Sequence, residues 1–176
     1  MNTPPLRVAL LGAESTGKST LAAALATHYR TVWVPEYLRE FVEEEQRTPQ
    51  EAEQFLIART QVEREDDLAR QAHTVLFCDT TPLMTAIYSQ FYFDRIDTAL
   101  KHLMRAHRYD YTIVTEPNTP WVADGLQRES DAVRQAVHTL LLETLAAEGI
   151  SFLLVSGEVE QRVQQVAEYL SQANAQ

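Results

Sequence analysis

The chain has 176 residues, of which 45% are hydrophobic and 23% are charged, and its formal net charge is −10. This length suits one globular domain with its own core, which we place at residues 1–176. The negative charge argues against binding to duplex nucleic acid, whose affinity comes from neutralised phosphates, and no apolar run reaches the roughly 20 residues of a membrane-spanning helix. The single cysteine, Cys78, excludes an internal disulfide, and no secretory signal is apparent. We therefore expect a cytoplasmic protein without nucleic-acid or membrane partners.

The predicted elements alternate between apolar strands and amphipathic helices. Strands are predicted at residues 6–11, 31–34, 74–79, 111–115 and 151–155. Helices are predicted from about residue 18, from Glu36, and over residues 48–72, 80–91, 96–107, 133–148 and 159–170. In the third helix Thr48 is the expected N-cap, with Pro49 in the first turn and Glu51 completing a capping box. Strands that are apolar throughout are typical of a parallel sheet covered on both faces, so we expect a three-layer α/β fold with five parallel strands.

The most informative motif lies between the first strand and the first helix. Residues 12–19 read Gly-Ala-Glu-Ser-Thr-Gly-Lys-Ser, which is the pattern of a P-loop. The glycines let backbone N–H groups turn toward a phosphate, and the helix N-terminus adds positive charge. Lys18 would reach the β- and γ-phosphates, and the Ser19 hydroxyl would ligate Mg²⁺. We predict ATP and Mg²⁺ as cofactors, with GTP as an open alternative to ATP. The predicted cofactor-binding residues are Gly12, Glu14, Ser15, Thr16, Gly17, Lys18, Ser19 and Thr20.

Acidic residues follow two of the other predicted strands. Asp79 ends a strand and could ligate Mg²⁺ as a Walker B acid does, or it could cap the next helix. Glu36 could accept the proton of an acceptor hydroxyl, or it could stabilise the start of its own helix. Arg39, one turn later, could orient Glu36 or hold a substrate, although an ion pair alone would also explain it. We predict Lys18, Glu36 and Asp79 as catalytic residues and leave the choice of base between the two acids open.

The longest irregular stretch, residues 117–130, is predicted to be a lid or substrate loop. Trp121 could stack on a flat or cationic ring. Asp124 suits ribose hydroxyls, and Arg128 could stabilise the charge on a transferring phosphoryl group, which makes it a fourth catalytic candidate. The alternative is a loop whose tryptophan anchors it to the core. For the adenine of ATP, the sequence points to the segment after the last strand, residues 156–158.

Together these motifs resemble the ribosylnicotinamide kinase domain of the NadR family over nearly all of residues 6–170. The resemblance is carried by G-A-E-S-T-G-K-S-T at 12–20, V-P-E-Y-x-R-E at 34–40, F-C-D-T at 77–80 and P-W-V-x-D-G-L-x-R at 120–128. It implies a P-loop NTPase fold of the nucleoside and nucleotide kinase type. It also implies phosphorylation of the 5′-hydroxyl of nicotinamide riboside by ATP, a step of NAD biosynthesis. The predicted substrate-binding residues are Glu36, Tyr37, Arg39, Asp79, Trp121 and Asp124.

Some expectations follow from the departures from that family. The family often joins this module to an adenylyltransferase, and only five residues precede the first strand, so we expect neither that activity nor DNA binding. A kinase for another nucleoside stays open. So does a regulatory P-loop ATPase that binds a protein partner through residues 40–70, where ten acidic and four basic side chains also suit a solvated helix face. The oligomeric state is not predicted.

Overall fold

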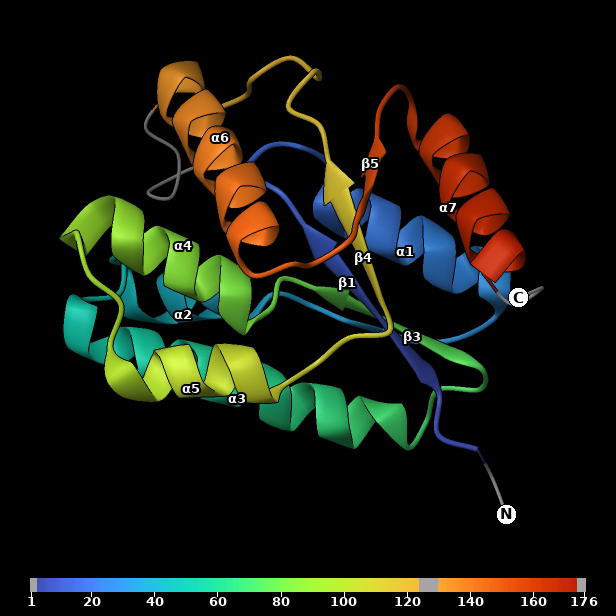
Figure 1. Cartoon of the computed structure of the whole chain (residues 1–176), viewed down its shortest axis with the longest axis horizontal. Helices are drawn as coiled ribbons and strands as arrows, with labels where there is room; N and C mark the ends of the chain where they lie inside the picture. Colours follow the sequence, from blue (N-terminus) through green and yellow to red (C-terminus); the bar gives the residue numbers. More distant parts are fainter. Residues whose placement is uncertain (1–2, 124–129, 174–176) are drawn as a thin grey trace.

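The computed structural model describes residues 3–123 and 130–173 (Figure 1). The strands are β1 (Leu6–Leu11), β2 (Trp33–Val34), β3 (Val75–Asp79), β4 (Tyr111–Thr115) and β5 (Leu153–Val155). The helices are α1 (Lys18–Tyr29), α2 (Tyr37–Glu45), the 3₁₀ turn η1 (Glu51–Glu53), α3 (Gln54–Ala69), α4 (Pro82–Phe93), α5 (Thr98–Ala106), α6 (Asp131–Ala147) and α7 (Val159–Ala173). Strands and helices therefore follow one another in the predicted order.

The five strands form one parallel sheet in the order β2-β3-β1-β4-β5. The central strand β1 pairs with β3 on one side and with β4 on the other, so that Ala9 lies opposite both Cys78 and Thr112. Parallel strands place all their carboxyl ends at one edge of the sheet, where ligands of such folds bind. The predicted parallel sheet is confirmed, although β2 is shorter than expected because only Trp33 and Val34 pair with β3.

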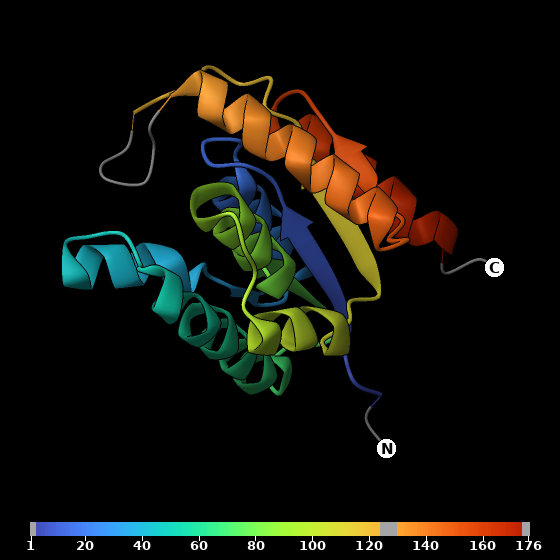
Figure 2. The same cartoon turned by 60° about the vertical axis from the view of Figure 1, so that its left-hand side comes forward.

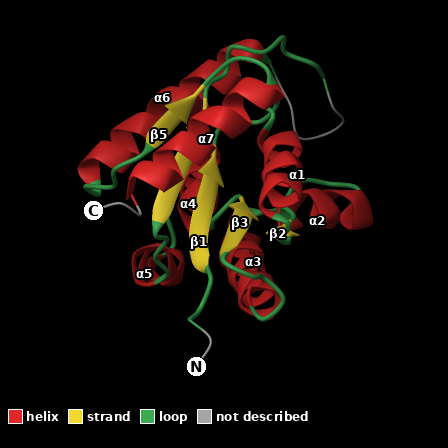
Figure 3. Cartoon of the chain, turned by 90° about the vertical axis from the view of Figure 1, so that its right-hand side faces the viewer, coloured by secondary structure: helices red, strands yellow, loops and turns green. Residues whose placement is uncertain are grey.

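Helices cover both faces of this sheet (Figure 3). On one face α1 and α7 contribute Leu25 and Val166 to a cluster with Val8 of the central strand. On the other face α4 and α6 contribute Met84 and Leu141 to a second cluster, and α2 and α3 lie on the flank of the molecule away from α7 (Figure 2). This arrangement confirms the expected three-layer P-loop fold. None of the helices in the described part of the chain is both long enough and apolar enough to span a bilayer.

The start of the third predicted helix is wrong by two residues. Gln50, not Thr48, occupies the cap position of η1, and Glu53 completes the capping box by accepting a hydrogen bond from the Gln50 N–H at 2.7 Å. Both candidate starts offer an acidic side chain three residues after the cap, so the sequence pattern fits either frame. Arg47 favours the later frame, because its guanidinium forms two hydrogen bonds with the Glu53 carboxylate at 2.7 and 2.8 Å.

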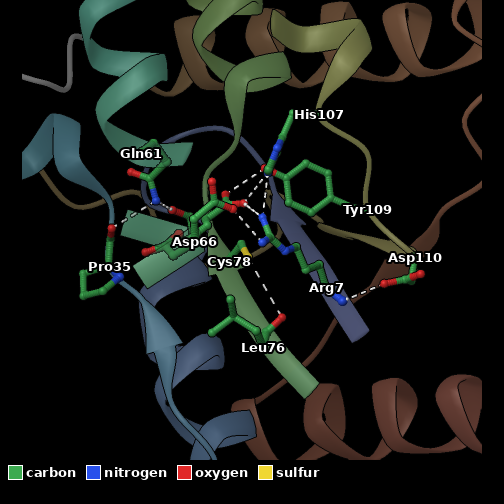
Figure 4. Close-up of polar contacts among 11 residues, drawn as sticks. Arg7, Pro35, Gln61, Asp66, Leu76, Cys78, His107, Tyr109 and Asp110 are labelled. Carbon is green, nitrogen blue, oxygen red and sulfur yellow. Dashed lines mark hydrogen bonds and ion pairs between the residues drawn. The ribbon is translucent and has the colours of Figure 1, made fainter. Parts of the chain in front are cut away.

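A buried polar cluster joins α3 to the sheet, at the end of β1 that lies away from the P-loop (Figure 4). The Glu65 side chain is fully buried. Its carboxylate accepts a hydrogen bond from the Tyr109 hydroxyl at 2.7 Å and contacts the His107 ring nitrogen at 2.6 Å. Burial raises the pKa of the Tyr109 hydroxyl, which therefore stays protonated and able to donate. Arg7 of β1 approaches the same carboxylate at 3.6 Å. This cluster fixes the middle of α3 relative to β1 and β4.

The Tyr109→Phe substitution should lower the free energy of unfolding by about 1–3 kcal/mol, because a buried carboxylate loses one of its donors. Denaturation in urea measures the change. Tyr29→Phe is the matched control, since the ring of Tyr29 packs against Phe77 and that packing is retained. Equal effects of the two substitutions would contradict the role given to the Tyr109 hydroxyl.

Candidate active site

The P-loop connects β1 to α1 in a conformation that its glycines permit. Gly17 is the N-cap of α1 with a φ of 84°, a left-handed value that side chains disfavour. A Cβ at Gly12 would collide with the hydroxyl oxygen of Thr115 on β4. The Thr16 hydroxyl donates to the carbonyl of Ala13 at 2.7 Å and also contacts Thr115, so this side chain holds the shape of the loop. The chain therefore closes tightly around the start of α1.

The predicted phosphate-binding lysine lies inside this turn. The Lys18 side chain is 7% exposed, and its ammonium donates to the Ala13 carbonyl at 3.1 Å. A cavity of about 170 Å³ opens beside it. That cavity is lined by Glu14, Ser15, Thr16, Gly17, Lys18, Ser19, Thr20, Glu36 and Arg39. The structure thus gathers nearly all of the predicted cofactor-binding residues around one cavity, together with two predicted substrate-binding residues.

Two buried arginines hold the outer side of the P-loop. Arg134 of α6 donates to the carbonyl of Ser15 at 3.1 Å, and Arg162 of α7 donates to the carbonyl of Thr16. In a trans peptide the C=O and the following N–H point in opposite directions. Because the arginines hold these carbonyls outward, the amides of Thr16 and Gly17 point to the opposite side of the loop. This orientation suits a phosphate-binding turn.

Arg162 also links the P-loop to the segments that follow β4 and β5. Its guanidinium donates to the Asn118 side chain at 3.0 Å and to the carbonyl of Gly157 at 2.9 Å. Burial lowers the pKa of Arg162, although a guanidinium stays charged at neutral pH. The segment predicted to contact adenine, residues 156–158, is therefore tied to the P-loop through one side chain.

The carboxylate of Asp79 lies against the start of α1. Its Oδ2 accepts a hydrogen bond from the Ser19 hydroxyl at 2.6 Å, and the side chain is fully buried. Its Oδ1 is buried and has no hydrogen-bond partner among the described residues. An open carboxylate oxygen beside a serine hydroxyl fits Mg²⁺, which takes one or two protein oxygens and completes its shell with phosphates and water. The N-cap alternative for Asp79 is wrong, because Thr81 occupies the cap position of α4.

The surroundings of Asp79 raise its pKa to about 6. Burial is the main cause, and the nearby charge of Glu36 acts in the same direction. Lys18, the Ser19 hydroxyl and Arg39 act against it by favouring the charged form. The carboxylate is therefore held in a position where its negative charge is only partly compensated.

Glu36 faces the P-loop from the end of β2. It occupies the cap position of α2, but its side chain makes no capping hydrogen bond there. Its Oε1 instead accepts a hydrogen bond from the Thr80 hydroxyl at 3.1 Å, which ties it to the residue after Asp79. Thr80 has a φ of 72°, an uncommon value for a β-branched residue and one found mainly at constrained sites. The two predicted acids are thus linked through adjacent positions at the ends of β2 and β3.

A second, larger cavity of about 420 Å³ adjoins the P-loop between α2, η1 and α4. Its lining residues include Glu14, Leu38, Val42, Gln54, Tyr88, Tyr92 and Phe93. Glu14 borders both cavities, so the two lie next to each other on either side of this residue. Six of its eleven lining residues are aromatic or aliphatic and two are acidic, Glu14 and Glu51, and a flat organic molecule would fit there.

Trp121 lies near this larger cavity, and the chain that carries it docks on the P-loop. The ring borders a small hollow together with Glu14, Tyr88 and Tyr92. Nearby, the Thr119 hydroxyl donates to the carbonyl of Ser15 at 3.1 Å. The first part of the predicted lid loop is therefore packed against the phosphate-binding turn.

The remaining predicted substrate residues have different outcomes. Tyr37 stacks under the guanidinium of Arg64, 4.6 Å from the ring centre, and does not line either cavity. Asp124 and Arg128 lie outside the described residues, so their roles stay predictions.

Sequence reasoning missed the two arginines and the aromatic wall. Arg162 follows Val159 by three residues and precedes Val166 by four, which puts it on the buried stripe of its helix. Arg134 precedes Val137 by three residues and Leu141 by seven, which puts it on the buried stripe of α6. An arginine at a position of the apolar helix stripe was therefore the sequence feature that could have predicted a buried, hydrogen-bonded side chain. The aromatic residues of the wall, Tyr88, Tyr92 and Phe93, all lie on α4 and are visible in the sequence, but the cavity that they line forms only when α2 and η1 pack beside that helix.

The fold, the P-loop and the buried strand-end carboxylate together define a nucleotide-binding P-loop domain of the phosphotransferase type. The AAA domain family profile matches residues 7–162, and the chain belongs to this family. The trifunctional NAD biosynthesis/regulator protein NadR of Salmonella typhimurium (strain LT2) is 36% identical over 153 residues, which cover 84% of this chain and 37% of NadR. The chain thus spans well under half the length of that relative.

Solved structures show the same fold. A crystal structure of the NadR protein in complex with NR has a TM-score of 0.81 at 23% identity, with 95% of this chain and 52% of that chain covered. Thymidylate kinase from Candida albicans has a TM-score of 0.69 at 16% identity, with 97% and 93% covered. These findings confirm the expected family resemblance and the expected class, a P-loop phosphotransferase.

Replacing Asp79 with Asn should stabilise the domain at neutral pH in the absence of ligands. The wild-type acid has a pKa of about 6 when folded and near 3.8 when unfolded. The folded state therefore holds this proton more tightly, and stability falls as pH rises between these values. We expect Asp79→Asn to gain about 1–3 kcal/mol over the wild type above pH 6, and to lose that advantage below pH 4. Urea denaturation across this range tests it; a difference independent of pH would contradict the electrostatic argument.

Proposed function

We propose that the chain is an ATP-dependent kinase that phosphorylates the 5′-hydroxyl of nicotinamide riboside to give nicotinamide mononucleotide. The main support is the second cavity, of about 420 Å³, which shares Glu14 with the cavity at the P-loop. A regulatory ATPase needs a site for nucleotide and water, whereas a kinase needs a second site for its acceptor next to the first. The similarity to NadR proteins over most of the chain supports the choice of a NAD-related nucleoside.

The chemistry of the cavity suits a cationic nucleoside. The nicotinamide ring of the riboside is flat and positively charged, and aromatic faces attract such rings. Tyr88 and Tyr92 stack with their ring centres 6.3 Å apart at the cavity wall. After burial, the charges of Glu14 and Glu36 contribute most to raising the pKa of the Tyr88 hydroxyl, which indicates a negative potential in this region. A cation entering the cavity would reduce that potential.

The P-loop residues would bind and orient the donor. Lys18 and the amides of the turn would hold the phosphates of ATP, while Ser19 and Asp79 would hold Mg²⁺. The metal, when bound, would supply positive charge that stabilises the negative charge on the transferring group. Most of the catalysis in such a reaction comes from positioning the two substrates in line and from neutralising charge.

Glu36 is the better candidate for the base that accepts the proton of the 5′-hydroxyl. Asp79 already accepts the Ser19 hydroxyl on one oxygen, and its other oxygen would be available to hold Mg²⁺. Glu36 borders the cavity at the P-loop, and within the described part of the chain its carboxylate accepts a hydrogen bond from the Thr80 hydroxyl. Arg39 borders the same cavity and would bind phosphate or orient Glu36.

We further propose that residues 1–176 act as one kinase domain, with 117–130 as the substrate loop. The single thiol, Cys78, is buried between sheet and helices, and burial raises its pKa, so it behaves as a small apolar side chain and not as a reactive group. Such a domain has no use for an oxidising compartment, and we place it in the cytoplasm, where ATP and nucleosides are available.

The direct test is to measure ADP release and product formation with a panel of nucleosides. Nicotinamide riboside should stimulate ADP release and yield nicotinamide mononucleotide, while uncharged nucleosides should be poor acceptors. Lys18→Ala should reduce turnover by more than about 100-fold, because the phosphates lose their main cation. Preference for another nucleoside would replace the proposed substrate. Steady hydrolysis that no nucleoside affects would point to a regulatory ATPase.

Trp121→Ala should raise the KM for the nucleoside about 10-fold or more while changing the KM for ATP less than about 2-fold, because stacking on one base is worth about 1–3 kcal/mol. Steady-state kinetics with each substrate varied in turn measure both constants. Val122→Ala is the matched control, since this neighbouring side chain is 60% exposed. Equal changes in both KM values would assign Trp121 a structural role instead.

A further inference from the structure

One buried side chain outside the P-loop forms hydrogen bonds with the backbone next to Glu36 and with the backbone of Asp79. Gln61 lies on α3 and is 2% exposed. Its Nε2 donates to the carbonyl of Pro35 at 3.1 Å and to the carbonyl of Asp79 at 3.3 Å. Its Oε1 accepts the N–H of Tyr37 at 2.8 Å. Figure 4 shows Gln61 reaching from α3 toward Pro35.

Two of these contacts flank Glu36 in the chain, and the third is to the backbone of Asp79. Pro35 and Tyr37 are the immediate neighbours of Glu36. Pairing between β2 and β3 ends where Val34 lies opposite Cys78. Glu36 therefore lies two residues beyond the last β2 residue that pairs with β3, and Asp79 lies one residue beyond the last β3 residue that pairs with β2, although Asp79 still pairs with Leu10 of β1. The Gln61 carboxamide bridges the two chains at that point.

The helix that carries Gln61 is itself fixed. Glu65 follows Gln61 by four residues and so projects from the same side of α3. Its carboxylate is held by three side chains, the Tyr109 hydroxyl at 2.7 Å, His107 at 2.6 Å and Arg7 at 3.6 Å, so loss of one leaves the other two. Gln61 thus extends from a rigid support, and its position does not depend on the P-loop or on the segment that carries Trp121.

We propose that Gln61 is a positioning residue that fixes the ends of β2 and β3 relative to each other and thereby sets the separation of the Glu36 and Asp79 side chains. The inference rests on the proposed function in that it assigns these acids to phosphoryl transfer. The chemistry explains why the residue is glutamine: an amide supplies two donors and an acceptor, whereas a carboxylate lacks the donors. A displacement of about 1 Å at reacting groups can reduce turnover about 100-fold.

The test compares Gln61→Met, which keeps the volume and removes all three hydrogen bonds, with Gln61→Glu, which keeps an acceptor for Tyr37 but removes the donors. We expect kcat to fall about 10–100-fold in both, with the KM for ATP changed less than about 2-fold, because the P-loop is untouched. Amide hydrogen exchange at Tyr37 should be at least about 10-fold faster in Gln61→Met and closer to wild type in Gln61→Glu.

Tyr109→Phe is the control, because it removes one hydrogen bond to Glu65 of the same helix and keeps the ring that packs against Val34 and Cys78. It should lower stability without changing kcat or exchange at Tyr37. A folded Gln61→Met protein with wild-type kcat and exchange would overturn the proposal, and so would a Tyr109→Phe protein with the same losses. If Gln61→Met does not fold, Gln61→Glu carries the comparison. The hydrogen-exchange measurement needs no nucleoside. If the wild-type protein is inactive on nicotinamide riboside, the proposed function is refuted, and amide exchange at Tyr37 still decides whether Gln61 has the proposed role.

Discussion

A buried, partly compensated negative charge is the constraint on which the site depends. Asp79 ends a central strand of the sheet and is removed from water, which disfavours its ionised form. Lys18 and Ser19 offset part of that penalty, and Glu36 adds to it. The domain therefore keeps its carboxylate in place at the expense of stability, as active sites often do. A divalent cation bound with nucleotide would compensate the buried negative charge, so binding of the cation would also stabilise the domain.

The second constraint is that the P-loop must present its amides before any phosphate arrives. Arg134 and Arg162 come from two different helices, on opposite faces of the sheet, and each holds a carbonyl of the turn from outside. Buried guanidinium groups are stable only when their donors are satisfied, so the pairing benefits both partners. The three layers of the fold thus meet at the turn. The amides are preorganised, and little reorganisation is needed when a charged ligand binds.

Features that depend on neighbouring residues in the chain could be predicted from the sequence, whereas features that depend on tertiary packing could not. Apolar runs identified all five strands, and the P-loop and Asp79 followed from their positions at strand ends. The helix start at Thr48 failed because two overlapping frames satisfy the same capping pattern, and an ion pair from Arg47 decides between them. The aromatic cavity and the contacts of Gln61 were not predictable, since each joins elements that are distant in the chain.

The two neighbouring cavities also indicate how a kinase on this fold would select its acceptor. If the larger cavity holds the acceptor, its apolar wall would keep water away from the transferring phosphate, which favours transfer over hydrolysis. Aromatic side chains such as Tyr88 and Tyr92 bind any flat ring and discriminate weakly between bases, because every base has a π-face. Charge discriminates more strongly: the potential from Glu14 and Glu36 favours a cationic ring and gives a neutral base no equivalent gain. Selectivity for a pyridinium nucleoside should therefore come from electrostatics more than from shape, and it should weaken as salt screens the open mouth of the cavity.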